Sequence, residues 1–280
     1  MTEKVGVIFA TTGRDYTQLA ERAARSVKEN CPGLEVDIFT DQVFDMPIFD
    51  CIHHLDDPWR RSKIDAMATS RFDKTLYLDA DLFVIADIRD LFEVLDRFDM
   101  AMAHDPIRNG ERCHTFWRKL LPNAFPQFNS GVIAYRHSTE VINLIKSWSV
   151  IVRENDFHRD QAVLRELVWE SDLRVTTLPQ EYNLMRYREL HLWKTHSSAP
   201  RIIHSTQLHR HFTKNKRRID TLEELLGPLI TSKLSLLLSA DRGLARMAGR
   251  QPYFPSVKDI WLRRLRLIRD IPRHWFRRFR

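Results

Sequence analysis

Two aspartates separated by one residue, Asp79 and Asp81, form the only Asp-x-Asp motif in the chain. They follow the apolar run Leu76–Leu78, which is typical of a buried strand. Side chains two positions apart on an extended segment point the same way, so both carboxylates can meet one cation. A hard divalent ion would relieve their mutual repulsion and keep open positions for phosphate oxygens. The alternative is a solvated turn after a strand, because so short a motif also arises by chance.

His204 is a candidate third ligand, because it ends the apolar run Arg201–Ile203 far downstream of the two aspartates. An imidazole added to two carboxylates favours manganese over calcium or magnesium. The alternative is an ordinary core or surface histidine, and position in the sequence alone does not decide between the two.

Other polar groups stand where predicted elements begin. Phe128-Asn129-Ser130-Gly131 leads into a strand that extends to Tyr135, and its small residues would let a ligand approach the backbone; a plain turn is the alternative. Asp160 and Gln161 open a helix with free N–H groups in its first turn, although Asp160 would also favour the helix start electrostatically. Lys63 is either solvated or placed to meet a diphosphate held by the metal.

The elements that must position these groups alternate between strand and helix. Apolar and β-branched runs predict strands at 4–11, 34–40, 75–78, 100–104, 131–135, 174–178 and 201–204. Apolar residues at helical spacing predict helices at 16–27, 61–72, 87–98, 140–154 and 159–170. Ligands of open α/β sheets bind at the carboxyl ends of strands, where Asp79 stands. The sequence therefore predicts an α/β fold with a mixed central sheet and helices on both faces.

Gly227-Pro228 interrupts this pattern, so we expect a body at residues 1–226 and a helical extension at 227–280, with a helix around 229–244. The tail at 256–280 holds nine Lys or Arg against two Asp, which accounts for the whole formal net charge of +7. Its apolar residues recur at helical spacing between arginines, as in helices that lie on anionic membranes. Packing of that helix against the body is the alternative.

Composition excludes several classes of protein. The chain is 43% hydrophobic and 29% charged, as in ordinary globular proteins, and its three cysteines contain no CxxC pair for zinc or redox chemistry. It lacks a signal-peptide pattern at its start and the ~20 consecutive apolar residues of a spanning helix. We therefore expect a cytoplasmic protein, peripheral on the inner face of the membrane through its tail. A nucleic-acid-binding protein is disfavoured, because the charge lies outside the body and no nucleic-acid-binding motif appears.

In order along the chain, these motifs resemble the retaining glycosyltransferases of family 8, which include glycogenin and bacterial lipopolysaccharide glucosyl- and galactosyltransferases. Residues 73–84, DKTLYLDADLFV, resemble the family's core DKVLYLDADVLV at nearly every position. The similarity covers roughly residues 4–212 and implies a GT-A fold.

The resemblance also implies roles for individual residues. Asp79, Asp81 and His204 would bind Mn²⁺ (or Mg²⁺) and, through it, the diphosphate of a UDP-sugar. The donor site would further include Ala10, Thr11, Thr12 and Tyr16 at the nucleoside, Lys63 and Arg210 at the diphosphate, and Asp105, Asn129 and Ser130 at the sugar. Asp160 and Gln161 would lie beside the anomeric carbon. The chain departs from the family at Gln207, where a glycine is usual, at Arg210, where the family has lysine, and at Gly13, where it has asparagine.

The activity that this resemblance implies is transfer of a hexose from a UDP-sugar to an acceptor hydroxyl with retention of configuration. The expected acceptor is a carbohydrate or a lipid-linked glycan, in the synthesis of lipopolysaccharide or cell-surface polysaccharide. A nucleotide-sugar hydrolase or a nucleotidyltransferase on the same fold is the alternative among enzymes.

Overall fold

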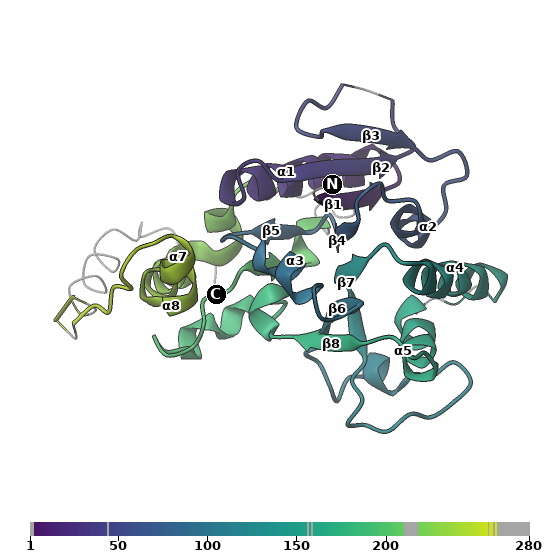
Figure 1. The fold of residues 1–280 in the computed structure, drawn as a ribbon. Coiled ribbons are helices and arrows are strands. Elements are labelled where there is room, and N and C mark those ends of the chain that lie inside the picture. The colour runs from purple at the N-terminus through teal and green to yellow at the C-terminus, as the bar shows by residue number, and fades with distance from the viewer. Residues whose placement is uncertain are drawn as a thin grey trace, which may run out of the picture. The chain divides into compact units, whose positions relative to one another are not determined.

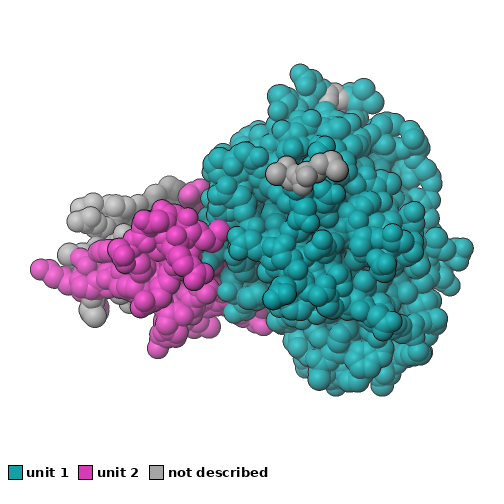
Figure 2. Space-filling model, viewed as in Figure 1, with its two compact units in different colours: residues 1–185, 201–216 teal, residues 186–200, 217–280 magenta. Residues whose placement is uncertain are grey.

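The structure is a computed structural model that describes residues 3–43, 45–155, 157, 159–209, 218–256, 258–259 and 261. It contains two compact units, residues 1–185 with 201–216 and residues 186–200 with 217–280 (Figure 2). The first unit holds the sheets and the second is helical where it is described. The predicted boundary at residue 226 stays a prediction.

A seven-stranded sheet forms the centre of the first unit, and its order is β3-β2-β1-β4-β7-β6-β8 (Figure 1). The nine described strands are β1 Val5–Thr11, β2 Glu35–Thr40, β3 Cys51–His54, β4 Lys74–Leu78, β5 Leu82–Val84, β6 Met100–His104, β7 Phe128–Arg136, β8 Val175–Leu178 and β9 Ile202–His204. Only β7 runs against its neighbours in this sheet, and β5 pairs with β9 in a small antiparallel sheet. The predicted mixed α/β architecture is confirmed, whereas β3 and β5 were not predicted.

Helices flank the sheet because each has one apolar side to bury. They are α1 Arg14–Asn30, α2 Ser62–Ala68, α3 Asp90–Val94, α4 Thr139–Glu154 and α5 Asp160–Glu170, with short 3-10 turns η1 Glu111–His114 and η2 Gln180–Tyr182. Helix α1 packs on β1, β2 and β5, whereas α2 packs on β1 and α4, and α5 on α4 and β7. Strand residues two apart, such as Ile133 and Tyr135, point to one face, where they join a core with Trp148 of α4.

Trp148 links this core to the start of α5. Its ring is fully buried, and its Nε1–H donates to the carbonyl of Asp160 at 2.8 Å. A buried indole needs such a partner, and removing a buried Trp costs roughly 3–5 kcal/mol. The core therefore fixes the position of the first residue of α5.

The second unit contains η3 Tyr187–Leu192, α7 Leu222–Ala240 and α8 Arg242–Met247 among its described residues. Gly227 has a positive φ of 71° and precedes Pro228, so α7 bends where the sequence predicted a break. A single helix was predicted around 229–244, and its predicted end is wrong, because α7 ends at Ala240. Asp241 interrupts it and caps α8 by accepting from the Leu244 N–H at 2.8 Å.

Candidate active site

The pairing of β5 with β9 brings the three predicted metal ligands together. Asp79 follows β4, Asp81 precedes β5, and Leu82 of β5 lies opposite His204 of β9. The Ser205 N–H donates to the Asp81 carbonyl at 2.9 Å, which holds the two segments in register. One ligand atom from each of Asp79, Asp81 and His204 lies within 4.8 Å of the others. The short pairing of β5 with β9 therefore brings together ligands that are far apart in the sequence.

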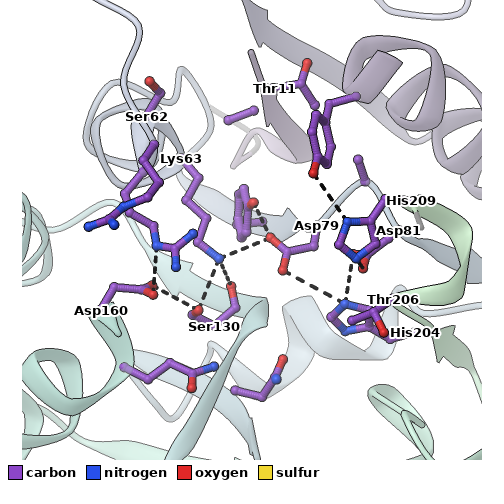
Figure 3. A pocket seen from close by; sticks show the side chains of 18 of the residues that line it. Thr11, Ser62, Lys63, Asp79, Asp81, Ser130, Asp160, His204, Thr206 and His209 are labelled. Atoms are coloured by element: carbon purple, nitrogen blue, oxygen red, sulfur yellow. Dashed lines mark hydrogen bonds and ion pairs between the residues drawn. The ribbon is translucent and has the colours of Figure 1, made fainter. Parts of the chain in front are cut away.

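The two oxygens of Asp79 have different surroundings. Oδ1 accepts from the Tyr77 hydroxyl at 2.5 Å and from Lys63 Nζ at 3.1 Å. Oδ2 faces His204, with 4.0 Å between Oδ2 and Nε2 (Figure 3). Because Oδ1 is already bonded, Oδ2 is the oxygen of Asp79 that is available to a cation.

His204 is oriented by a buried amide. Asn183 Oδ1 lies 2.9 Å from His204 Nδ1, and Asn183 Nδ2 donates to Asn129 Oδ1 at 2.8 Å. Both Asn183 and His204 are only 4% exposed. An oxygen at Nδ1 favours the tautomer with its proton there, which turns Nε2 toward the aspartates as a ligand.

Charge holds this group together. Burial alone would raise the pKa of Asp81, but the charge of His204 and its hydrogen bond lower that pKa to about 2. Burial would lower the pKa of His204, yet the charges of Asp81 and Asp79 raise it. Nε2 of His204 lies 2.9 Å from Asp81 Oδ1, so positive charge is favoured between these atoms.

Gly131 makes room for the ligands. A Cβ at this position would lie 2.4 Å from His204 Cε1 and 2.8 Å from Asp79 Oδ2. No side chain fits in such a space, so β7 can pass the two ligands only with glycine at this point. The Asp79 N–H also donates to the Gly131 carbonyl at 2.8 Å, which ties the carboxylate to β7.

The donor set suits a divalent cation such as Mn²⁺, because two carboxylates and one neutral imidazole supply oxygen and nitrogen ligands. The fit depends on Asp79 Oδ2, Asp81 and His204 Nε2 converging on one space that Gly131 leaves open. These observations favour a cation site over a solvated turn.

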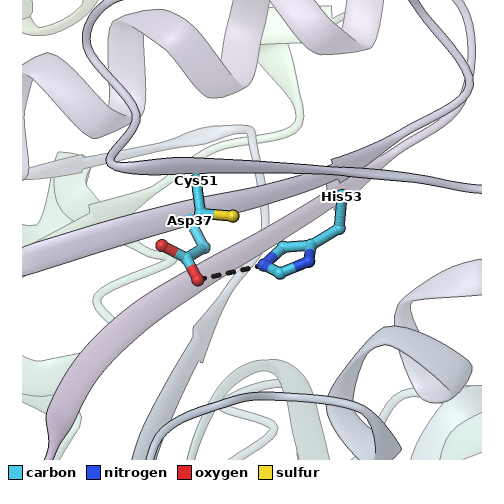
Figure 4. A group of neighbouring side chains, drawn as sticks. All are labelled: Asp37, Cys51 and His53. Atoms are coloured by element: carbon cyan, nitrogen blue, oxygen red, sulfur yellow. Dashed lines mark hydrogen bonds and ion pairs between the residues drawn. The ribbon is translucent and has the colours of Figure 1, made fainter.

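A second group with ligand-type side chains, Asp37, Cys51 and His53, lies on β2 and β3 (Figure 4). Arg71 donates to both oxygens of Asp37, from Nε at 2.7 Å and from Nη2 at 2.9 Å. His53 Nε2 also lies near this carboxylate, 3.1 Å from Asp37 Oδ2. Because a guanidinium already neutralises this carboxylate, the group needs no metal.

Asp160 lies on the other side of Asp79 from His209 (Figure 3). Its Oδ1 pairs with Arg61 Nε at 3.0 Å, and its Oδ2 accepts from the Ser130 hydroxyl at 3.2 Å. Lys63 Nζ donates to the carbonyl and the hydroxyl of Ser130, at 3.0 and 3.1 Å. A chain of contacts thus connects the metal ligands to the first residue of α5.

Tyr16 of α1 marks the end of the site opposite Asp160. Its hydroxyl lies 3.3 Å from His209 Nδ1, and His209 Nε2 lies 3.5 Å from Asp81 Oδ2. The Thr11 hydroxyl is bonded to that of Thr17 at 3.0 Å, below the surface. Burial and then the charge of Asp81 raise the pKa of Tyr16, so its hydroxyl stays protonated near neutral pH.

These groups line a single cleft of about 690 Å³, within the range of small-molecule sites. Of the predicted site residues, the cleft is lined by Ala10, Thr11, Thr12, Tyr16, Lys63, Asp79, Asp81, Asn129, Ser130, Asp160, Gln161 and His204. Asp105 does not line it: this buried carboxylate instead accepts from the Ile107 N–H at 2.9 Å. Arg210 lies outside the described residues.

The sequence alone did not single out several residues of the site. Arg61 pairs with Asp160, Asn183 orients His204, and His209 contacts Asp81. Arg61 stands two residues before Lys63, but sequence proximity does not reveal an ion pair. No pattern in the sequence distinguishes Asn183 from other asparagines, because its partners come from β7 and β9.

A model of the family described as nucleotide-diphospho-sugar transferase matches residues 59–218. This stretch is more than half of the chain and includes the candidate metal ligands and Asp160. The chain belongs to the nucleotide-diphospho-sugar transferase family. Among curated proteins, none matches the sequence.

Several solved structures of glycosyltransferases have the same fold as this protein. GlyE from Streptococcus pneumoniae TIGR4 is 18% identical, with a TM-score of 0.57; the match covers 92% of this chain and 66% of GlyE, just under two thirds. LgtC in complex with donor and acceptor sugar analogs is 14% identical, with a TM-score of 0.53 over 86% of this chain and 99% of LgtC. The bifunctional glycosyltransferase WbbM is 16% identical, with a TM-score of 0.51 over 73% of this chain and 46% of WbbM. The fold is thus that of GT-A glycosyltransferases, as the sequence predicted.

Proposed function

We propose that this transferase moves a hexosyl group from a UDP-sugar to an acceptor hydroxyl and retains the anomeric configuration, as the family 8 enzymes that it resembles do. The observation that carries the proposal is the order of groups along one cleft. Tyr16 lies at one end, the Asp79–Asp81–His204 group in the middle and Asp160 beyond it. Nucleoside, diphosphate and sugar follow one another in the same order in the donor.

In this proposal Asp79, Asp81 and His204 hold Mn²⁺, or Mg²⁺ in its place. The cation, when bound, supplies Lewis-acid stabilisation of the charge that develops on the departing diphosphate. Lys63 Nζ lies 3.1 Å from Asp79 Oδ1, so its positive charge is next to the same diphosphate. Arg210, outside the described residues, is proposed to clamp a phosphate in the same region.

Asp160 and Gln161 are proposed to position the sugar for attack from the face that the diphosphate leaves. Both oxygens of Asp160 are engaged, by Arg61 and by Ser130, and the residue is 4% exposed. A carboxylate held in this way suits an orienting role better than that of a covalent nucleophile. Asn129 and Ser130, both nearly buried in the cleft wall, are proposed to contact the sugar.

Ala10, Thr11, Thr12 and Tyr16 are proposed to bind the uridine. Tyr16 is 47% exposed, so its ring is accessible to a base. Rings stack readily on aromatic side chains because both have π-faces. Asp105 is left out of the proposed donor site, because its carboxylate accepts from the Ile107 N–H and does not line the cleft.

The acceptor is proposed to be a carbohydrate or a lipid-linked glycan, in lipopolysaccharide or cell-surface polysaccharide synthesis. The basic tail at 256–280, most of which lies outside the described residues, would dock the protein on the anionic inner face of the membrane. Among described residues, the helices are all too short or too polar to cross a membrane.

Product analysis tests this function. The protein is incubated with Mn²⁺ and a panel of UDP-hexoses, with and without saccharide acceptors, and the products are resolved by NMR. Transfer with retained configuration is expected. Free sugar as the sole product would indicate a hydrolase, a new sugar nucleotide would indicate a nucleotidyltransferase, and an inverted glycoside would refute retention.

A further inference from the structure

Four arginines line the cleft at its Asp160 end: Arg60, Arg61, Arg112 and Arg159. Arg61 pairs with Asp160, and Arg60 donates to the Phe157 carbonyl at 2.8 Å, just before α5. Arg159 directly precedes Asp160, and its Nη2 lies 3.5 Å from Oε2 of Glu111 in η1. Arg112 is the next residue of η1. The side chains of Arg60, Arg61 and Arg159 therefore gather around the start of α5, and Arg112 follows Glu111, which contacts Arg159.

Two of these arginines have protein partners that account for them. Arg61 is matched by a buried carboxylate, and Arg60 by a main-chain carbonyl. They would be expected in the cleft wall even if no ligand reached them.

Arg159 and Arg112 are not accounted for in this way. The Nη1 of Arg159 is buried and donates to no group of the described protein. Its ion pair with Glu111 is long, at 3.5 Å, and the Glu111 side chain is 86% exposed, so the pair is weak. The carbonyl of Arg112 accepts from the Thr115 hydroxyl, but the exposed Arg112 side chain, which lines the cleft, has no hydrogen bond or ion pair with a described residue. Although the Arg159 side chain as a whole is 37% exposed, its buried Nη1 lacks an acceptor, so an acceptor from a ligand would stabilise this arrangement.

The net charge of the cleft also favours an anionic ligand. Its described lining contains five lysine or arginine side chains and three carboxylates. The two charges of a divalent cation cancel the two charges of a donor diphosphate. The side chains of the lining as a whole therefore keep an excess of two positive charges in the loaded cleft.

We infer that Arg112 and Arg159 bind a second anionic group, a carboxylate or a phosphate, carried by one of the two sugars. The inference rests on the proposed function, because it places this group beyond the donor diphosphate. The arginine fork matches a carboxylate or phosphate through paired N–H donors, which a neutral hydroxyl cannot equal. The anion belongs either to a hexuronic acid donor or to a phosphorylated acceptor.

Calorimetric titrations in Mn²⁺ separate the two sources. The first arm compares UDP-glucuronate and UDP-galacturonate with UDP-glucose and UDP-galactose. The second arm saturates the protein with UDP and compares galactose 6-phosphate and glucose 6-phosphate with the unphosphorylated sugars. We expect the charged ligand to bind at least about tenfold more tightly in one arm, as charge-assisted hydrogen bonds allow.

Variants locate the effect. Arg112→Gln combined with Arg159→Gln should abolish the preference for the charged ligand, and each single change should reduce it. Arg97→Gln, which removes an exposed arginine outside the cleft, should leave the preference intact.

Other results of these titrations would refute the second anion site, its assignment to Arg112 and Arg159, or the proposed function. If UDP binds but neither arm distinguishes charged from neutral ligands, the second anion site is wrong and the proposed function stands. If the preference survives in the double variant, its assignment to Arg112 and Arg159 is wrong. If UDP itself does not bind, the proposed function fails, and this inference fails with it.

Discussion

Replacing Gly131 with alanine should destroy the cation site while leaving a folded protein. The new Cβ would lie 2.4 Å from His204 Cε1, whereas ordinary contact begins at 3.4 Å, so ligand and strand must separate by about 1 Å. Metal sites tolerate deviations of only about 0.2 Å in ligand distance. The affinity for Mn²⁺ should therefore fall by more than the roughly 10–100-fold that follows loss of a ligand's hydrogen-bond partner.

Gly6→Ala is the matched control. Its Cβ would lie 2.3 Å from Phe72 Cζ in the core, and Gly6 does not line the cleft. Both substitutions overpack the same sheet and should cost about 1–3 kcal/mol, measured by urea unfolding. Mn²⁺ affinity is then measured by calorimetry on the folded proteins. If Gly131→Ala binds Mn²⁺ as tightly as the wild type, or if Gly6→Ala loses as much affinity, the proposed ligand geometry is refuted.

Three further changes test the orientation of His204, the division of roles between Asp160 and Lys63, and the tail. Asn183→Ala should weaken Mn²⁺ binding roughly 10–100-fold, because His204 loses the partner that orients it; unchanged affinity by calorimetry would exclude that role. Asp160→Asn should lower turnover far more than UDP affinity, whereas Lys63→Ala should weaken UDP itself, and calorimetry that finds the reverse would contradict this division. A chain ending at Pro255 should stay folded and still act on soluble acceptors, yet fail to co-sediment with anionic liposomes at low salt; equal sedimentation of both forms would exclude docking through the tail.

The sequence predicted the position of the two aspartates because their local pattern is strong. A buried strand must end before it meets charged residues, and the Asp-x-Asp motif follows Leu78 directly. The strands of the central sheet other than β3, and most helix positions, also followed from periodicity. These are local features, which neighbouring residues along the chain largely determine.

The start of β7 was predicted incorrectly, because local composition misled. Asn129, Ser130 and Gly131 are small or polar, which is typical of a turn, but the strand begins at Phe128 and includes all three. Tertiary contacts override local preference here: Phe128 pairs with His104 of β6 beyond a register shift, and the Gly131 carbonyl accepts from the Asp79 N–H. Gly131, which is typical of a turn, is needed in the strand because a side chain there would collide with Asp79 and His204.

The role of His204 could not be decided from position alone. Strands β5 and β9 have three residues each, too short for a periodic signal, and their register is a tertiary feature. Asn183 went unnoticed for the same reason, since its hydrogen bonds link residues far apart in sequence. Asp105 directly follows β6, but its carboxylate accepts a hydrogen bond within its own loop, from the Ile107 N–H.

Cation-assisted binding of the nucleotide in this cleft is tested by a titration of the purified protein with UDP, in Mn²⁺ and again after chelation, with Asp79→Asn and Asp81→Asn measured in parallel. We expect saturable binding at one site in Mn²⁺, which is lost on chelation, restored by added Mn²⁺ and strongly weakened in both variants. UDP binding of equal affinity without the cation, or in either variant, would contradict a cation-assisted nucleotide-sugar site in this cleft.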